Sequence, residues 1–201
     1  MPWPFVLGML ILVILLFVQL KKQGEIRSKI KVCLEETADD GELERLLQTK
    51  GLRLLGTDAE IDDARVRLYR MRKDTDGMER ELQKMNSRVS PIQLDYLWGI
   101  DRFFFALLKK DRQDAIEAAT FTLQVADNGC KQKWGKKLEA FAALIRLLQP
   151  ETISERERGH LLQQVSSALE AEGGFSRVES AWLSEDLLVF DICLSQSEKA
   201  E

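Results

Sequence analysis

The sequence predicts an all-α protein, in which a single transmembrane helix at the N-terminus is followed by a soluble helical bundle or by stacked helical hairpins. Residues 3–20 are an uninterrupted apolar run in which Gln19 is the only clearly polar side chain. The 201 residues include only four prolines, and they are 45% hydrophobic and 31% charged. After the run, apolar residues recur at helical spacing. This combination is typical of an ordered, predominantly helical chain.

The apolar run predicts a membrane anchor. A helix rises 1.5 Å per residue, so residues 3–20 extend about 27 Å, close to the thickness of the hydrocarbon core of a bilayer. A cleaved signal peptide instead carries basic residues before its apolar core and a small-x-small cleavage site after it. Here Lys21 and Lys22 follow the run and no basic residue precedes it. We therefore expect residues 1–22 to form an uncleaved signal-anchor.

Charge is segregated along the chain. Residues 1–20 carry no charged side chain, residues 21–31 carry a net charge of +4, and residues 32–201 therefore carry −8 of the total of −4. Because basic flanks stay on the cytoplasmic side, we expect the N-terminus outside and the body in the cytoplasm, with a bacterial inner membrane favoured. The acidic body argues against a nucleic-acid partner. The candidate contacts to lipid headgroups are Lys21, Lys22, Arg27, Lys29 and Lys31.

The rest of the chain divides by pattern. Residues 23–56 are expected to form juxtamembrane helices and a linker, residues 90–195 a helical-hairpin domain, and residues 196–201 a flexible tail. Residues 57–89 are expected to form a long heptad-patterned helix, because apolar or small residues step by three and four from Ile61 to Met85. Thr75 and its acidic neighbours weaken the middle of this pattern, so a break is plausible there. Whether residues 58–86 pair within the chain or with a second copy stays open.

Capping signals divide the hairpin domain into helices. Ser90-Pro91 begins one helix, and the Ser154–Glu157 and Ser176–Glu179 pairs have the form of capping boxes that begin two others. For residues 185–194 helix is favoured, although a strand stays open.

Aromatic residues crowd the helix expected at residues 91–110. This helix is apolar on most sides, as is usual for one at the centre of a domain. Trp98, Phe103 and Phe105 admit two interpretations, as core residues or as an exposed partner-binding patch, and we prefer the core.

Residues 109–128, KKDRQDAIEAATFTLQVADN, resemble the second helix of a tetratricopeptide repeat. Ala115, Ala118 and Ala119 lie where that family has small residues that allow two helices to pack closely. The preceding helix departs from the family's Trp-Leu-Gly spacing, and no 34-residue period recurs. The resemblance covers about a third of the chain. It implies helical hairpins stacked side by side, an arrangement that binds partner proteins.

No motif for phosphate binding, dinucleotide binding, zinc hydrolysis or a nucleophilic serine occurs in the chain. His160 is the only histidine, and Cys33, Cys130 and Cys193 are far apart, so we predict no catalytic, metal or cofactor site and no enzyme. The expected function is that of a membrane-tethered adaptor or scaffold, or of an accessory subunit of a membrane-associated complex, which binds a protein partner through its cytoplasmic helical domain. The alternatives are an enzyme or regulator of an unrecognised helical family, and an anionic-lipid-binding membrane protein.

Overall fold

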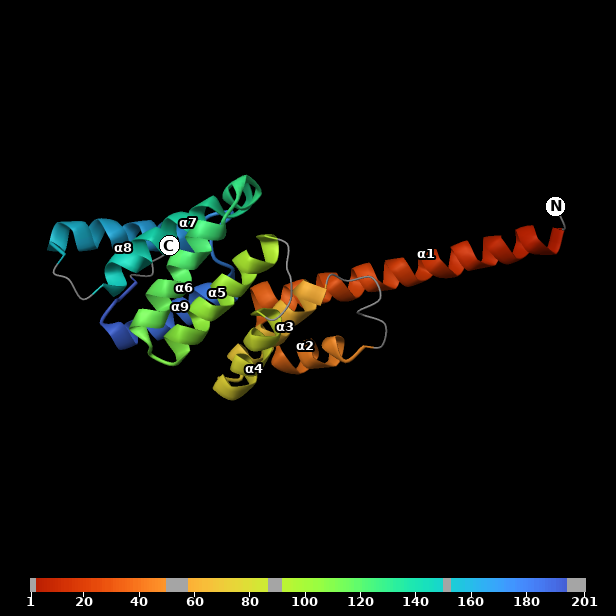
Figure 1. Cartoon of the computed structure of the whole chain (residues 1–201), viewed down its shortest axis with the longest axis horizontal. Coiled ribbons are helices and arrows are strands. Elements are labelled where there is room, and N and C mark those ends of the chain that lie inside the picture. Colours follow the sequence, from red (N-terminus) through yellow and green to blue (C-terminus); the bar gives the residue numbers. More distant parts are fainter. Residues whose placement is uncertain (1–2, 50–57, 87–91, 150–152, 195–201) are drawn as a thin grey trace, which may run out of the picture.

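The computed structural model describes residues 3–49, 58–86, 92–149 and 153–194. Every regular element within these ranges is a helix, which confirms the all-α prediction. Figure 1 shows α1 projecting from a body in which α2, α3 and α4 lie around its C-terminal part, with α5 to α9 beyond them. The predicted tail at residues 196–201 lies outside the described residues.

Helix α1, Trp3–Val32, continues from the apolar run into the body without interruption, across the boundary predicted at residue 22. A π-helical segment, η1 Cys33–Thr37, ends it at Ala38, whose φ of 52° reverses the chain. Helix α2, Asp40–Leu47, begins at Asp39, whose carboxylate accepts from the Glu42 amide at 2.9 Å. Within the described residues, no helix combines the length and apolarity that crossing a membrane requires. The side chains of residues 3–7, where the predicted span begins, lie outside the described ones.

The segment predicted as one long helix at residues 57–89 is a hairpin of two helices, α3 Asp58–Met71 and α4 Thr75–Asn86. Lys73 adopts a φ of 53° between them. The Asp74 carboxylate then accepts from the Gly77 amide at 2.9 Å and begins α4. The break therefore falls where acidic residues weaken the heptad pattern. Met71 is half-buried, and the other apolar residues of that pattern are buried against the chain's own helices: Ile61, Ala64, Leu68, Met78, Leu82 and Met85.

Helix α5, Ile92–Leu108, packs against α6, Arg112–Val125, more extensively than any other described pair of helices. Close packing depends on small residues. Ala115, Ala118 and Ala119 are fully buried, and a Cβ added to Gly99 of α5 would lie 2.4 Å from Oγ1 of Thr122 in α6. The three alanines are thus buried, and the role of Gly99 was not predicted.

A second hairpin and a final helix complete the body: α7 Asn128–Leu148, α8 Glu155–Glu170 and α9 Arg177–Leu187. Ser154 and Ser176 cap α8 and α9, and both hydrogen bonds of a capping box are present at Ser176. The segment left open at residues 185–194 continues α9 to Leu187, forms the short 3₁₀ helix η3 Leu188–Phe190, and contains no strand.

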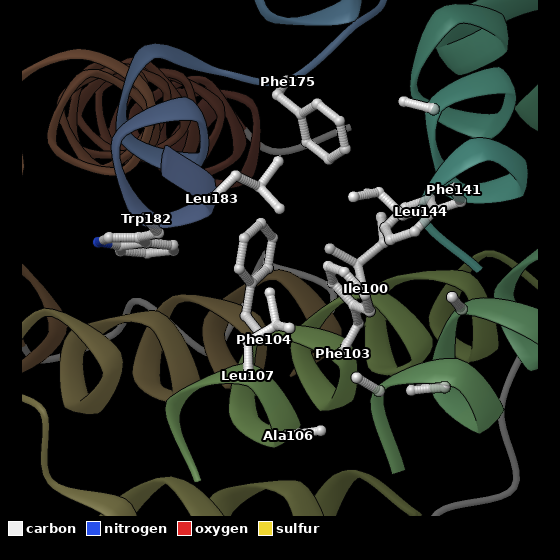
Figure 2. Packing of buried hydrophobic residues seen from close by; sticks show 14 of the residues in the cluster. Ile100, Phe103, Phe104, Ala106, Leu107, Phe141, Leu144, Phe175, Trp182 and Leu183 are labelled. Carbon is white, nitrogen blue, oxygen red and sulfur yellow. The ribbon is translucent and has the colours of Figure 1, made fainter. Parts of the chain in front are cut away.

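The main core forms around α5. Figure 2 shows Trp182 and Leu183 of α9 facing Phe104 of α5, with Phe141 of α7 beside Phe103. The rings meet edge to face, with centroids 4.9 Å apart for Phe103 and Phe141 and 5.5 Å apart for Phe104 and Trp182. This geometry is favourable for aromatic pairs. Helix α5 therefore occupies the central position expected from its apolar faces.

Candidate functional site

The N-terminal half of α1 exposes apolar side chains on every side. All residues from Gly8 to Lys22 are exposed, and eleven of them are large apolar residues whose exposed fraction lies between 44% and 68%. Burying one such side chain stabilises it by about 1.5–3 kcal/mol relative to water. Contiguous exposed apolar surfaces on this scale mark protein or membrane contacts. These residues are Met9, Leu10, Ile11, Leu12, Val13, Ile14, Leu15, Leu16, Phe17, Val18 and Leu20.

Basic residues follow this surface directly. Lys21, Lys22, Arg27, Lys29 and Lys31 all lie on the exposed part of α1, as contact with lipid headgroups would require. Their position next to the apolar stretch gives α1 two chemically distinct parts, an apolar rod and a basic segment at residues 21–31.

The C-terminal part of α1 is held by the body. Ile30 of α1 and Cys33 and Leu34 of the adjoining η1 are buried in a second, smaller core. Their partners in that core are Leu43 and Leu46 of α2 and Ile61, Ala64 and Leu68 of α3. Because α1 is one continuous helix, this second core holds the exposed apolar rod at a fixed angle to the body.

A buried ionic network joins α3 to the main body. Nε of Arg67 donates to Oδ1 of Asp63 at 3.0 Å and lies 3.5 Å from Oδ1 of Asp101 in α5. Nη1 of Arg67 lies 3.1 Å from Oε1 of Glu179 in α9. Nζ of Lys137 in α7 donates to the other oxygen of Glu179 at 2.7 Å. All five side chains are buried, so the network connects four helices through charges that are shielded from water.

Two carboxylates of this network, Glu179 and Asp101, have opposite pKa shifts. Burial alone would raise the pKa of Glu179, but Lys137 and Arg67 outweigh burial and lower that pKa to about 2. Burial raises the pKa of Asp101 well above its ordinary value, the neighbouring Asp63 adds to the effect, and Arg67 offsets only part of it. Glu179 is therefore an anion that helps to balance the charge of both cations, whereas burial opposes the ionisation of Asp101.

Two further ion pairs connect α3 to α9. Arg70 is buried, donates to Asp186, and lies with its guanidinium carbon 5.1 Å from the centroid of the Trp182 ring. Lys73 donates to Glu185 at the exposed end of the same interface. Arg67 and Arg70 are spaced three residues apart and so lie along one side of α3, and Lys73 lies in the turn that follows α3. Together with the Arg67–Glu179 pair, these two ion pairs hold α9 against α3, the helix that also packs on the C-terminal part of α1.

The residues proposed as a partner-binding patch lie mostly in the core. Phe103 and Phe105 are buried, so the exposed-patch interpretation is wrong for them and the preferred core interpretation is confirmed. Trp98 is half-buried. Its indole N–H donates to the Leu82 carbonyl at 3.2 Å, and its ring meets Phe121 edge to face.

Side chains with reactive chemistry are dispersed. His160 is exposed on α8, Cys33 and Cys130 are buried, and Cys193 is exposed. Burial raises the pKa of the Cys33 and Cys130 thiols, which disfavours the nucleophilic thiolate. In the part of the chain that the structure describes, no three His, Cys, Asp or Glu side chains are grouped in a way that could hold a metal ion.

Comparison of the chain with models of protein families, with curated proteins and with solved structures gives no match. The candidate site therefore depends on the geometry of this chain alone: an exposed apolar rod, a basic segment and a body fixed to both.

Proposed function

We propose that the chain is a membrane-tethered helical adaptor, or an accessory subunit of a membrane-associated complex, whose body binds a protein partner beside the bilayer. The observation that carries this proposal is the N-terminal half of α1, with eleven consecutive or nearly consecutive large apolar side chains exposed. Lipid is the surrounding in which a helix that is apolar on all sides is stable. The proposed span is residues 3–20, as in the sequence analysis.

The basic segment supports an orientation for this span. Five exposed cations follow the apolar rod, and each cation near an anionic membrane surface contributes about 1 kcal/mol of attraction. Basic flanks remain in the cytoplasm. The proposal therefore places the body in the cytoplasm and the basic segment at the lipid headgroups.

The adaptor role is supported by the body itself. Helices α5 with α6 and α7 with α8 form adjacent hairpins, an arrangement similar to tetratricopeptide modules, which bind partners. Its buried charged side chains pair with one another and so stabilise the fold. Tethering such a module raises the effective concentration of a captured partner at the membrane without any new contact.

The span is tested by extraction of membranes at alkaline pH, which releases peripheral proteins. The full chain should stay in the membrane fraction, and a Leu12→Arg/Leu16→Arg variant should be released. A Gln163→Arg/Gln164→Arg variant, which changes exposed positions of α8, is the matched control and should stay. Release of the unchanged protein would contradict the span.

Orientation can be read from a native thiol. Cys193 is exposed whereas Cys33 and Cys130 are buried, so a membrane-impermeant maleimide should react with Cys193 alone. Intact cells should show no labelling and lysed cells full labelling, with Cys193→Ser as the control. Labelling in intact cells would place the body outside the cytoplasm.

The adaptor role itself is tested by purification from native membranes in mild detergent after crosslinking. A stoichiometric protein partner is expected. A monodisperse, partner-free monomer would count against the adaptor proposal and leave the tether intact.

A further inference from the structure

Beyond α1, the described residues expose large apolar side chains at only one place. Leu188 and Val189 of η3 have exposed fractions of 54% and 49%. The other large apolar residues of the described body are buried or half-buried. An adjacent exposed pair on an otherwise polar body is a candidate contact for another molecule.

The pair is presented by a well-fixed turn. The Ile192 amide donates to the Leu187 carbonyl at 3.1 Å, Ile192 is buried, and Asp191 takes a φ of 58°. Arg158 of α8 donates to the Asp191 carbonyl. Leu188 and Val189 are therefore held at the surface by the fold, and do not belong to a frayed helix end.

Basic side chains lie beside this turn. The guanidinium carbon of Arg112 lies 5.4 Å from the centroid of the Phe190 ring, and Arg112 directly follows the α5–α6 turn that carries Lys109 and Lys110. All three cations are exposed, and no ion pair within the described residues involves them. That turn is also fixed, because the Asp111 amide donates to the Ala106 carbonyl at 2.9 Å.

Nearby carboxylates leave this surface basic. Glu185 is paired with Lys73, and the Asp111 carboxylate accepts from the Asp114 amide as the cap of α6. Asp111 and Asp191 contribute two exposed carboxylates against the three cations, which leaves a net positive charge. The local charge is thus opposite to that of the body, which is acidic as a whole.

Position separates this surface from the proposed membrane contact. Figure 1 shows the end of α9 and the α5–α6 turn at the side of the body away from the projecting half of α1. We propose that Leu188 and Val189, flanked by Lys109, Lys110 and Arg112, form a docking site for an acidic amphipathic segment of a partner protein. The partner's apolar side chains cover the pair and its carboxylates meet the cations. This inference rests on the proposed adaptor function and specifies the chemistry of the partner.

The test uses the full chain in mild detergent and a display library of random peptides. The expected peptides combine two or more large apolar residues with net negative charge. Binding of a selected peptide, measured by fluorescence anisotropy, should weaken about tenfold or more in Leu188→Asp/Val189→Asp and in Lys109→Glu/Lys110→Glu. The matched control Lys131→Glu/Lys133→Glu makes the same charge change on exposed positions of α7 and should change the affinity less than about twofold.

Each other outcome overturns the docking site. Selected peptides that are neutral or basic, or whose binding is unchanged in both patch variants, refute the acidic amphipathic partner. Binding that occurs only after removal of residues 195–201 assigns the surface to the chain's own C-terminal segment. Because peptide binding requires no membrane, a failed tether shows in the extraction experiment, and a failed docking site shows only here.

Discussion

Replacing Glu179 by glutamine removes its charge and keeps its shape, so the change in the free energy of unfolding should show what the charge alone contributes. Glu179 is 1% exposed, accepts from Lys137 at 2.7 Å, and lies 3.1 Å from Arg67. The same side chain accepts from the Ser176 amide at 2.9 Å and so begins α9. Glutamine retains the size and the capping acceptor but leaves two buried cations without their shared anion. Loss of one partner from a buried pair costs about 3–5 kcal/mol.

The pKa of Glu179 gives a second route to this magnitude. Against the opposing effect of burial, Lys137 and Arg67 lower the pKa from 4.5 to about 2, and one pH unit corresponds to about 1.4 kcal/mol, so the folded state gains about 3 kcal/mol from ionised Glu179. Because the folded-state pKa is depressed, this stability is fully present above pH 4.5 and is lost as the pH falls toward 2. The difference between the native protein and Glu179→Gln should therefore shrink across that window.

The measurement is urea unfolding of the full chain in mild detergent, followed by far-ultraviolet circular dichroism. At neutral pH, Glu179→Gln should lower the free energy of unfolding by about 3 kcal/mol. The matched control is Glu185→Gln, whose exposed pair with Lys73 contributes about 0–1 kcal/mol. Equal effects of the two substitutions at neutral pH, or a Glu179 effect that persists unchanged near pH 2, would refute the proposed charge balance.

Three further substitutions test neighbouring features by the same urea measurement. Asp101→Asn should preserve or raise the free energy of unfolding at neutral pH. Burial raises the pKa of Asp101, so its ionisation opposes folding as the pH rises above the ordinary carboxyl range. A loss above about 3 kcal/mol would show instead that the fold requires Asp101 as an anion. Gly99→Ala should cost about 1–3 kcal/mol, since its Cβ would lie 2.4 Å from Oγ1 of Thr122, and adding Thr122→Ala should recover part of that loss through their coupling. Gly174→Ala should cost about 3 kcal/mol or more, because its Cβ would lie 1.9 Å from the rigid Ala168 carbonyl oxygen; an unchanged unfolding midpoint would contradict the α8–α9 turn.

Periodicity and capping signals predicted most of the fold because both act over a few residues. The apolar heptad residues from Ile61 to Met85 are buried except for half-buried Met71, and Ser154 and Ser176 begin helices as expected. The hairpin at Lys73 was harder to place, since a heptad pattern reads alike in one long helix and in two that fold back. Only the acidic cluster near Thr75 indicated the break.

The ionic network could not be predicted from local pattern. Arg67 and Arg70 occur among other charged residues, where side chains normally face water, yet both are buried. Their partners are remote, and Arg70 and Asp186 are separated by 116 residues. Glu179 was expected as a capping residue of α9, but its pairing with Arg67 and Lys137 depends on how four helices pack. Similarly, nothing in the apolar run after Asp186 distinguishes exposed Val189 from buried Leu187.

The uninterrupted helix from the apolar rod into the body also determines the direction in which the body faces. Each residue of an α-helix advances the chain by about 1.5 Å and turns it by about 100°. One residue inserted near Gly24 would therefore rotate the entire body, including η3, about the axis of α1. Four inserted residues make about one full turn and would nearly restore the original orientation. Because α1 is continuous, the number of residues between Leu20 and Ile30 determines the direction in which each surface of the body faces.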